Sequence, residues 1–439
     1  MKMLRKQLVT LTAAASMAMP LTAMATNGMN AEGTGAKNRG MGGAGVALAI
    51  ESASVTNNPA AAVLAGNRWD VALGLFDPSP RGYTLDGQPA DINPGAPGDN
   101  NFNSSQTSSD DTFLIPFFGM VSPIDDKSSW AFVMNANGGM NTEYATNFGS
   151  KFGQSGPTGV NLAQLFVNGT YARKLTDSFS VGFTAIYAYQ TFEAKGLGAF
   201  GQATVDSKNL TDNGEDTSDG AGFKVGAHFN MGEGLSLGVA YQHKITMTKF
   251  SKYKGLFQNG GSLDIAPTYS VGLAYVASPA LTFAFDYLYI DYNQVDTISN
   301  ATSLYKNTNP GTPCGTDAAD VCFGGANGPG FGWKSINVYK LGAQYAMSPT
   351  FTLRAGWNHG ESPVQNDDIS MAFLVPGVTK DHATVGFTMG ISKTSEFTFN
   401  YVKSLEAKQS GPFSPSFGGG TMTVGMEQSF FEFGYASHF

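Results

Sequence analysis

Beyond Gly66 the chain consists of segments in which apolar and polar residues alternate, joined by connections that are long and short in turn. Alternation with a period of two predicts β-strands with one apolar and one polar face. Fourteen segments fit this pattern, at residues 69–75, 111–121, 128–138, 162–174, 179–192, 223–229, 235–241, 269–275, 281–289, 339–345, 351–357, 383–389, 397–401 and 431–439. Long loops on one side and short turns on the other are typical of an up-and-down barrel in a membrane, whereas a β-sandwich has no such asymmetry. The sequence therefore predicts an all-β fold, a 14-stranded antiparallel transmembrane β-barrel.

The composition of the two strand faces indicates which face meets lipid. On many strands one parity carries Phe, Tyr, Leu, Val and Trp, while the other carries Gly, Thr, Asn and charged residues. Tyr and Trp often stand near strand ends, where transmembrane barrels have aromatic girdles. The 55 glycines, 32 phenylalanines and mean hydropathy of −0.12 suit a barrel that is apolar only outside, although a secreted soluble all-β protein has a similar composition. We expect the apolar face to point outward.

The first 25 residues have the features of an export signal. Lys2, Arg5 and Lys6 form a basic start, residues 8–19 are apolar, and residues 23–25 read Ala-Met-Ala, as at a cleavage site. We therefore expect a signal peptide at residues 1–25. No later stretch approaches the roughly 18 uninterrupted apolar residues of a spanning helix. The net charge of −8 argues against nucleic acid as a partner.

The two cysteines, Cys314 and Cys322, lie in a loop rich in Gly, Pro and Asn. In the oxidising compartment that an export signal indicates, we expect them to form a local disulfide. Because no histidine neighbours them, they are a weak zinc site. We assign no metal and no cofactor.

Residues 26–66 are rich in glycine and other small residues. Seven glycines fall between Gly28 and Gly45, which disfavours an isolated helix but suits a backbone that passes close to other groups in a confined space. Asn58, Pro59 and Ala60 then form a turn signal, in which Pro59 favours an extended Asn58. A flexible glycine-rich linker is the alternative. We expect residues 26–66 to form a hatch inside a barrel made by residues 67–439, with Lys37 and Arg39 bound to the wall by salt bridges.

The chain ends on Phe439, and aromatic residues at 431, 433 and 435 share its parity, which is similar to the insertion signal of bacterial outer-membrane barrels. Two further motifs are residues 40–44 leading to Asn58-Pro59-Ala60, and residues 373–378 followed by His382 and Gly386. Together with the fourteen strands, these motifs resemble the FadL-type family (OMPP1/FadL/TodX-like) of outer-membrane transporters for hydrophobic compounds. The resemblance spans the whole mature chain, and the Asn-Pro-Ala segment is its most specific part.

This resemblance implies a barrel in the bacterial outer membrane, surrounded by lipid and lipopolysaccharide, whose N-terminal segment folds inward as a hatch. We expect a monomer. The substrates of the family are long-chain fatty acids and aromatic hydrocarbons, which extracellular loops capture and which leave sideways beside a kinked third strand. No enzyme activity is expected, because the histidines are scattered and no G-x-S-x-G motif is present. A structural barrel or surface adhesin without transport is the main alternative.

Apolar residues in the long loops are the candidates for substrate capture, namely Leu197, Phe200, Leu256, Phe257, Phe373 and Leu374. Exposed together on one membrane side, they would form a binding patch, whereas packing within each loop is the alternative. An exit is expected where Pro116 interrupts one strand and Asn137-Gly138 ends its neighbour, because proline removes a ladder hydrogen bond and Asn-Gly favours a bulge. Alternatively, Pro116 only ends the paired region early.

Four cations have the parity of the polar, inward face: Lys224, Lys244, Lys340 and Arg354. Because Lys224 and Lys244 lie on strands that we expect to pair, they are the first candidates to bind a carboxylate head group. Ion pairs with Asp286, Glu432 or Glu51 are the alternative. We therefore favour uptake of long-chain fatty acids, with an aromatic-hydrocarbon channel as a second possibility.

Overall fold

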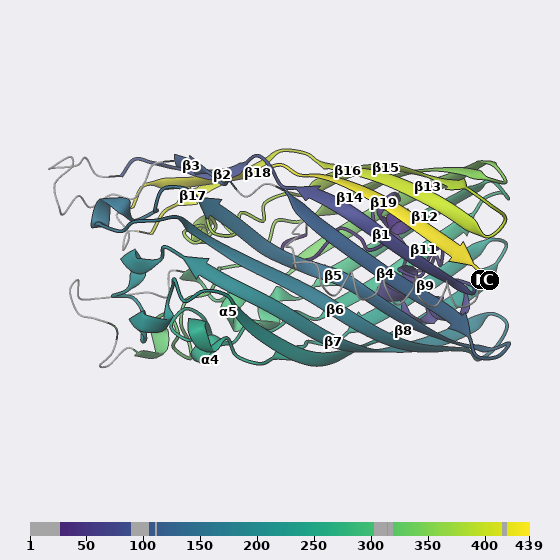
Figure 1. The fold of residues 1–439 in the computed structure, drawn as a ribbon, viewed down its shortest axis with the longest axis horizontal. Helices are drawn as coiled ribbons and strands as arrows, with labels where there is room; N and C mark the ends of the chain where they lie inside the picture. The colour runs from purple at the N-terminus through teal and green to yellow at the C-terminus, as the bar shows by residue number, and fades with distance from the viewer. Residues whose placement is uncertain (1–26, 89–104, 110–111, 303–313, 315–318, 415–418) are drawn as a thin grey trace.

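The computed structural model describes residues 27–88, 105–109, 112–302, 314, 319–414 and 419–439. The predicted signal peptide lies outside these residues. Strands enclose an elongated barrel, with the long connections at the left end in Figure 1 and the short turns and the C-terminus at the right end.

The wall is a closed antiparallel sheet of fourteen long strands. They are β1 (Arg68–Asp77), β4 (Phe113–Pro123), β5 (Ser128–Tyr144), β6 (Thr158–Lys174), β7 (Phe179–Lys195), β8 (Asp216–Gly232), β9 (Leu235–Gln242), β11 (Thr268–Val276), β12 (Leu281–Ile290), β13 (Ile336–Ser348), β14 (Phe351–Gly360), β15 (Asp381–Gly390), β16 (Ser395–Ser404) and β19 (Ser429–His438). Their order is β8-β7-β6-β5-β4-β1-β19-β16-β15-β14-β13-β12-β11-β9, and pairing of β8 with β9 closes the barrel. The two-residue β10 (Thr246–Met247) pairs with Gly220 and Ala221 of β8. The predicted 14-stranded barrel is confirmed, and each predicted segment overlaps one of these strands.

Several strands run further toward the long-loop end than the apolar alternation predicts. β5 continues to Tyr144, and β8 begins at Asp216. The pairing of β7 with β8 persists as far as Phe192 and Asp216, although the residues of β8 there are polar or small. The alternation of apolar and polar residues therefore marks the part of each strand that faces lipid, and backbone hydrogen bonds extend the strands beyond that part.

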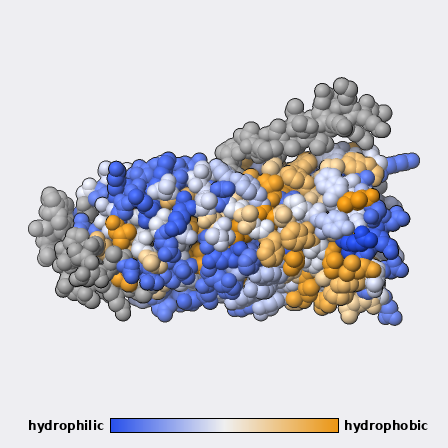
Figure 2. Space-filling model, turned by 90° about the horizontal axis from the view of Figure 1, so that it is seen from below, coloured by the Kyte–Doolittle hydropathy of each residue, from blue (hydrophilic) through white to orange (hydrophobic). Residues whose placement is uncertain are grey.

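The apolar face of the wall points outward, as predicted. On β13, for example, Leu341 is 55 % exposed whereas the adjacent Lys340 is only 6 % exposed. Tyrosine rings lie side by side near the long-loop ends of neighbouring strands, with centroids 4.9 Å apart for Tyr241 and Tyr269 and 5.6 Å apart for Tyr287 and Tyr339. Figure 2 shows apolar side chains over the right-hand half of one face, while the left-hand half is hydrophilic. The barrel has the apolar outer surface that a lipid bilayer requires.

A second sheet, which the sequence did not predict, covers part of the long-loop end. We call it the cap sheet. It contains β2 (Arg81–Asp86), β3 (Ser105–Thr107), β17 (Ala407–Pro412) and β18 (Thr421–Met426), in the order β17-β18-β2-β3 (Figure 1). We expected loops in both regions of the chain. The missed signal is the alternation that buries Tyr83 and Leu85 on β2 and Met422 and Val424 on β18.

Helices are short and confined to the N-terminal segment and the long loops. The described helices are α2 (Ala36–Arg39), α3 (Ser54–Asn57), α4 (Gln258–Gly261) and α5 (Asp296–Ser299), with 3₁₀ turns η1 (Pro59–Val63), η2 (Ser150–Phe152), η3 (Gly198–Phe200), η4 (Ser207–Asn209), η5 (Ser251–Tyr253), η6 (Tyr292–Gln294), η8 (Ala319–Val321) and η9 (Asn366–Asp368). Within the described residues, no helix is both long and apolar enough to cross a membrane.

Residues 27–66, which we call the N-terminal segment, contact the inward face of the wall. The backbone nitrogens of Gly45 and Val46 donate to the carboxylate of Asp286 on β12, at 2.7 and 3.0 Å. Gly42 and Gly356 meet so closely that a Cβ on Gly356 would lie 2.1 Å from the nitrogen of Gly42. Glycine on both sides of this contact lets backbone pack against backbone. The glycines of the segment thus serve close packing, as expected for a confined space.

Candidate functional site

A large apolar cluster, here called the mouth core, fills the long-loop end of the barrel. It includes Tyr83 of the cap sheet, Tyr144 of β5, and the loop residues Phe148 and Phe373, whose rings lie 4.1 Å apart. All six predicted capture residues belong to it: Leu197, Phe200, Leu256, Phe257, Phe373 and Leu374 are 1, 3, 7, 2, 0 and 1 % exposed. The expectation that they form an exposed patch is therefore wrong, because residues from several loops pack against one another.

The connection between β14 and β15 inserts into this core. Residues 369–378, the mouth loop, are buried, and the loop is tied to β5 by two side-chain hydrogen bonds. Tyr144 donates its hydroxyl to the carbonyl of Phe373 at 2.6 Å, and Thr142 donates to the carbonyl of Leu374 at 2.8 Å. Residues 373–378, which carry part of the family resemblance in the sequence, are thus buried inside the mouth core.

The start of the N-terminal segment contacts the mouth core from inside the barrel. The hydroxyl of Tyr292 on η6 donates to the carbonyl of Asn27 at 2.8 Å and accepts from the nitrogen of Met29 at 3.0 Å. Burial raises the pKa of Tyr292, so its hydroxyl stays neutral and keeps the proton that it donates. Trp333 packs edge-on against this ring, at 5.5 Å between centroids.

The pairing of β4 with β5 covers only the short-turn half of β4. It runs from Pro123 and Ser129 to Phe117 and Asn135, whereas β4 continues to pair with β1 through Pro116 as far as Phe113. β5 carries a register shift between Ala136 and Gly138, at the predicted bulge. Nearer the long-loop end, the chain before β4 contacts β5 again, where the backbone nitrogen of Ser109 donates to the carbonyl of Glu143 at 2.8 Å. We call the stretch where residues 113–116 of β4 are paired with β1 but not with β5 the window.

The N-terminal segment pairs with β5 at the window. Asn30 forms a bridge with Gly138, the nitrogen of Ala31 donates to the carbonyl of Asn137 at 3.2 Å, and the nitrogen of Gly139 donates to the carbonyl of Met29 at 3.2 Å. The edge of β5 at the bulge is therefore covered from the lumen by residues 29–31.

Buried apolar side chains line the inward face of the barrel wall beside the window. Phe113 and Ile115 of β4 are buried together with Phe76 of β1 and Phe430 of β19, and Ala31 and Ala136 pack against them. We did not identify these residues from the sequence. The available signal was that Phe113, Ile115 and Phe117 alternate with the apolar Leu114 and Pro116, so that both parities of this strand are apolar.

A polar cavity of about 100 Å³ lies between the N-terminal segment and the wall, and Asn135, Asn137, Lys224 and Lys340 are among its lining residues. The ammonium of Lys224 donates to the carbonyl of Thr56 at 2.6 Å, and that of Lys340 donates to the carbonyl of Glu32 at 2.8 Å. Two of the four predicted lumen cations therefore lie together behind the window, each bonded to the backbone of the N-terminal segment.

The other two predicted cations lie elsewhere. Arg354 on β14 donates to the hydroxyl of Thr388 at 2.7 Å. Lys244 follows the end of β9 at Gln242, and its ammonium pairs with Asp264 at 3.0 Å in the long-loop region. Its expected position on a strand paired with that of Lys224 is wrong, because β9 ends two residues earlier and Gln242 takes the position opposite Lys224.

Residues 12–427 match the family described as outer membrane protein transport protein (OMPP1/FadL/TodX). The chain belongs to this family. It is a bacterial outer-membrane protein and a transporter of hydrophobic compounds, and the members of the family are transport channels.

Individual relatives are distant. The long-chain fatty acid transport protein of Escherichia coli O6:H1 is 21 % identical over 325 residues, which cover 64 % of this chain and 67 % of that protein. The crystal structure of the P. putida toluene transporter TodX matches with a TM-score of 0.64 and 16 % identity over 93 % of this chain and 99 % of TodX. A Pseudomonas aeruginosa FadL homologue matches with a TM-score of 0.66 and 15 % identity over 94 % of this chain and all of that one. At these identities the structural likeness indicates the fold alone.

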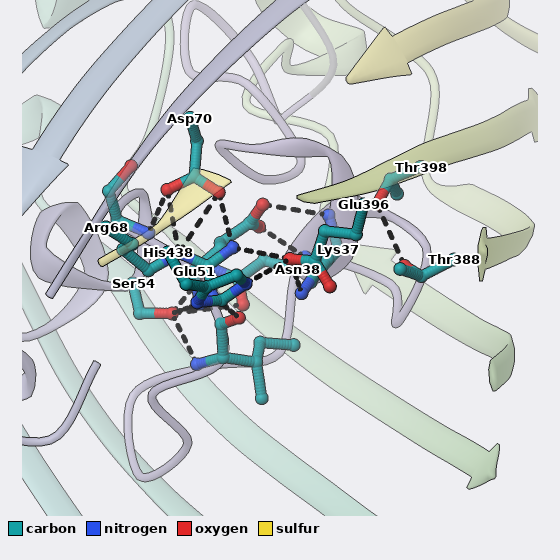
Figure 3. A network of polar contacts seen from close by, with 12 residues as sticks. Lys37, Asn38, Glu51, Ser54, Arg68, Asp70, Thr388, Glu396, Thr398 and His438 are labelled. Atoms are coloured by element: carbon teal, nitrogen blue, oxygen red, sulfur yellow. Dashed lines mark hydrogen bonds and ion pairs between the residues drawn. The ribbon is translucent and has the colours of Figure 1, made fainter. Parts of the chain in front are cut away.

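In this FadL-family barrel, buried ion pairs fasten the N-terminal segment to the wall near the short-turn end (Figure 3). The ammonium of Lys37 lies 2.5 Å from Glu396, which also pairs with Arg68 at 2.8 Å. Arg39 bonds Glu432 of β19 and Glu32 of its own segment, both at 2.7 Å. The predicted salt bridges from Lys37 and Arg39 to the wall are confirmed. Glu51 instead accepts from the backbone nitrogens of Lys37 and Asn38, at 3.1 and 2.7 Å.

The Asn-Pro-Ala motif forms a second attachment. Asn58 is extended, as predicted, and its side-chain oxygen accepts from the nitrogen of Ala60 at 3.0 Å. Its amide group donates to the carbonyl of Val46 and to the carbonyl of Ala227 on β8, both at 2.9 Å. One side chain therefore links two parts of the FadL-family N-terminal segment to each other and to the wall.

The predicted disulfide between Cys314 and Cys322 is present. Among the described residues, no group of three or more His, Cys, Asp and Glu side chains could hold a metal ion. The expectations of no metal and no cofactor stay predictions.

Proposed function

We propose that this protein takes up long-chain fatty acids, which bind in the mouth core, enter the barrel and leave sideways through the window. The observation that supports this route is the end of β4–β5 pairing at Phe117 and Asn135, beside a wall lined with Phe76, Phe113 and Ile115. A hydrocarbon chain is favoured in apolar surroundings. An opening that leads from an apolar lining into lipid therefore suits such a substrate better than a route into water.

In this proposal the N-terminal segment is a hatch that closes the straight path to the short-turn end. Its ion pairs with Glu396 and Glu432 and its bonds to Asp286 support a hatch that stays in place during transport. Breaking a buried ion pair by removing one partner costs about 3–5 kcal/mol. The substrate therefore needs only local movement of residues 29–31, which detach from β5 to uncover the window.

We propose that Lys224 binds the carboxylate head group. It lines the polar cavity with Asn135 and Asn137 of the window strand, and its bond to the carbonyl of Thr56 can be exchanged for one to a substrate. The ammonium is the charged donor in both bonds, but a carboxylate brings a full negative charge where the carbonyl of Thr56 brings only a dipole, so the attraction to the substrate is stronger. The apolar tail then extends toward Phe113 and Ile115.

In this proposal the predicted capture residues still bind the substrate, but inside the mouth core rather than on an exposed patch. A fatty acid enters by separating side chains that now pack together, chiefly those of the mouth loop and the cap sheet. Aromatic rings that slide apart around a flexible chain offer it a continuous apolar contact, with no need for an exposed patch.

Transport of aromatic hydrocarbons is the second candidate. The phenylalanines beside the window favour it, because a neutral ring needs no cationic partner. A structural or adhesive barrel is the third, and it would use the exposed face of the cap sheet rather than an interrupted wall.

Uptake of labelled oleate and labelled toluene by cells with and without the protein tests the proposal. We expect oleate uptake to depend on the protein and to fall about tenfold in Lys224→Met, as the loss of one hydrogen bond to a charged group predicts. Lys408→Met is the matched control, since the side chain of Lys408 is 66 % exposed. Dependence of toluene uptake alone would favour the second candidate, and no dependence of either would overturn transport of both compounds.

A further inference from the structure

Arg81 is a buried arginine of the cap sheet that sits at the window. It begins β2 and is 3 % exposed. Its Nη2 atom donates to the side-chain oxygen of Asn141 on β5 at 2.6 Å. Its guanidinium carbon lies 5.7 Å from the centroid of the Phe113 ring on β4. One side chain therefore contacts both strands that border the window.

These contacts fall in the interval where β4 and β5 are not paired with each other. Their pairing begins at Phe117 and Asn135, so Phe113 and Asn141 are several residues nearer the long-loop end. We propose that Arg81 is a positioning residue that holds the two edges of the window together in the closed state. This inference rests on the proposed function, because it assigns a closing contact to the proposed exit.

Arginine suits this position for chemical reasons. Its planar guanidinium donates along its edge and stacks with its face, so it can bond an amide and cover an aromatic ring at once. In a buried site both contacts are stronger than in water. A lysine would bring one compact charge, which cannot keep both contacts in the same geometry.

The same strand connects the window with the mouth core. Tyr83, two residues after Arg81 on the same face of β2, packs against Tyr144 and Phe373 at 5.1 and 5.6 Å between centroids. A substrate that enters between these rings displaces β2. Because Arg81 is carried by β2, this displacement withdraws it from Asn141 and Phe113. Entry of substrate at the mouth thus loosens the exit.

Two substitutions with opposite expected effects test the role of Arg81. Arg81→Met removes both contacts, so we expect initial uptake of oleate and of a neutral analogue, the methyl ester, to rise about tenfold if one hydrogen bond to a charged group holds the window. Asn141→Asp replaces that bond by an ion pair, so we expect both rates to fall. Arg81→Lys should lie between the unchanged protein and Arg81→Met. Arg173→Met, at an exposed position, is the control.

Each result bears on one claim. Rates of both compounds that fall or stay unchanged in a folded Arg81→Met protein would overturn the proposal. Loss of oleate uptake alone in Arg81→Met, with the ester unaffected, would also overturn it and indicate a head-group site. If the unchanged protein carries neither compound, the proposed function fails before Arg81 is considered. Heat-modifiable mobility of the folded barrel on gels shows whether each variant is folded.

Discussion

The hydroxyl of Tyr144 donates a 2.6 Å hydrogen bond to the backbone carbonyl of Phe373. Tyr144 ends β5, the strand that borders the window, and Phe373 lies in the mouth loop. The bond therefore joins the element that fills the mouth to the strand that edges the proposed exit. Thr142, two residues earlier on the same face of β5, makes the equivalent bond to Leu374.

Tyr144→Phe should loosen the mouth loop. The substitution keeps the ring in the mouth core but leaves the buried carbonyl of Phe373 without its donor, at a cost of about 1–3 kcal/mol. We expect faster hydrogen exchange at the amides of Leu374 and Val375, which are bonded within the loop. Tyr345→Phe, where the ring is 51 % exposed, is the control. Equal exchange in the variant and the unchanged protein would mean that ring packing alone holds the loop.

Removing one partner from the ion pairs at the short-turn end should have unequal effects. In Lys37→Met, Glu396 keeps Arg68 at 2.8 Å, whereas in Glu396→Gln the buried ammonium of Lys37 loses its anionic partner. We expect Glu396→Gln to destabilise the N-terminal segment by up to about 3–5 kcal/mol and Lys37→Met by less. Ion conductance across a planar bilayer shows how often the N-terminal segment is displaced in each variant, because a displaced segment opens the barrel to water. A larger loss in Lys37→Met than in Glu396→Gln would contradict this account, because it would mean that Glu396 depends on Lys37 more than Lys37 depends on Glu396.

The barrel was predictable because its signal is local and repeated. Leu341 and Lys340 differ in exposure because the first faces outward and the second faces the lumen. Lys37 and Arg39 were predictable as well, since charged residues in a confined segment need charged partners.

The loops were not predictable in the same way. Phe200 and Phe257 show no periodicity that separates an outward from an inward position, and their burial depends on contacts with residues distant in sequence. Lys244 has the parity of an inward residue, but parity loses its meaning in the gap between the end of β9 at Gln242 and the start of β10 at Thr246. The strands of the cap sheet alternate too briefly, and lie too far apart in sequence, to indicate their pairing.

Asn58→Asp should detach the Asn-Pro-Ala turn. The substitution keeps an oxygen that accepts from Ala60 but removes the two amide bonds to the carbonyls of Val46 and Ala227. A buried carboxylate then faces two carbonyl oxygens, which is unfavourable. We expect a lower free energy of unfolding, by about 2 kcal/mol or more. Asn230→Asp is the matched control, because the exposed Asn230 acts as an acceptor from Gly232; similar losses in both variants would contradict the role assigned to Asn58.

Gly356→Ala should displace the N-terminal segment without altering the lipid-facing side of the wall. A Cβ at this position would lie 2.1 Å from the nitrogen of Gly42 and 2.2 Å from the carbonyl carbon of Met41, far inside van der Waals contact. Both groups are backbone, so relief requires the segment to move. Gly169→Ala, also on a barrel strand, meets no atom within 4 Å and should be neutral. We expect higher bilayer conductance in Gly356→Ala alone, with the same folded mobility on gels for both variants. Unchanged conductance in a folded Gly356→Ala protein would show that the segment tolerates movement without opening the barrel, and would contradict the role assigned to this close backbone contact.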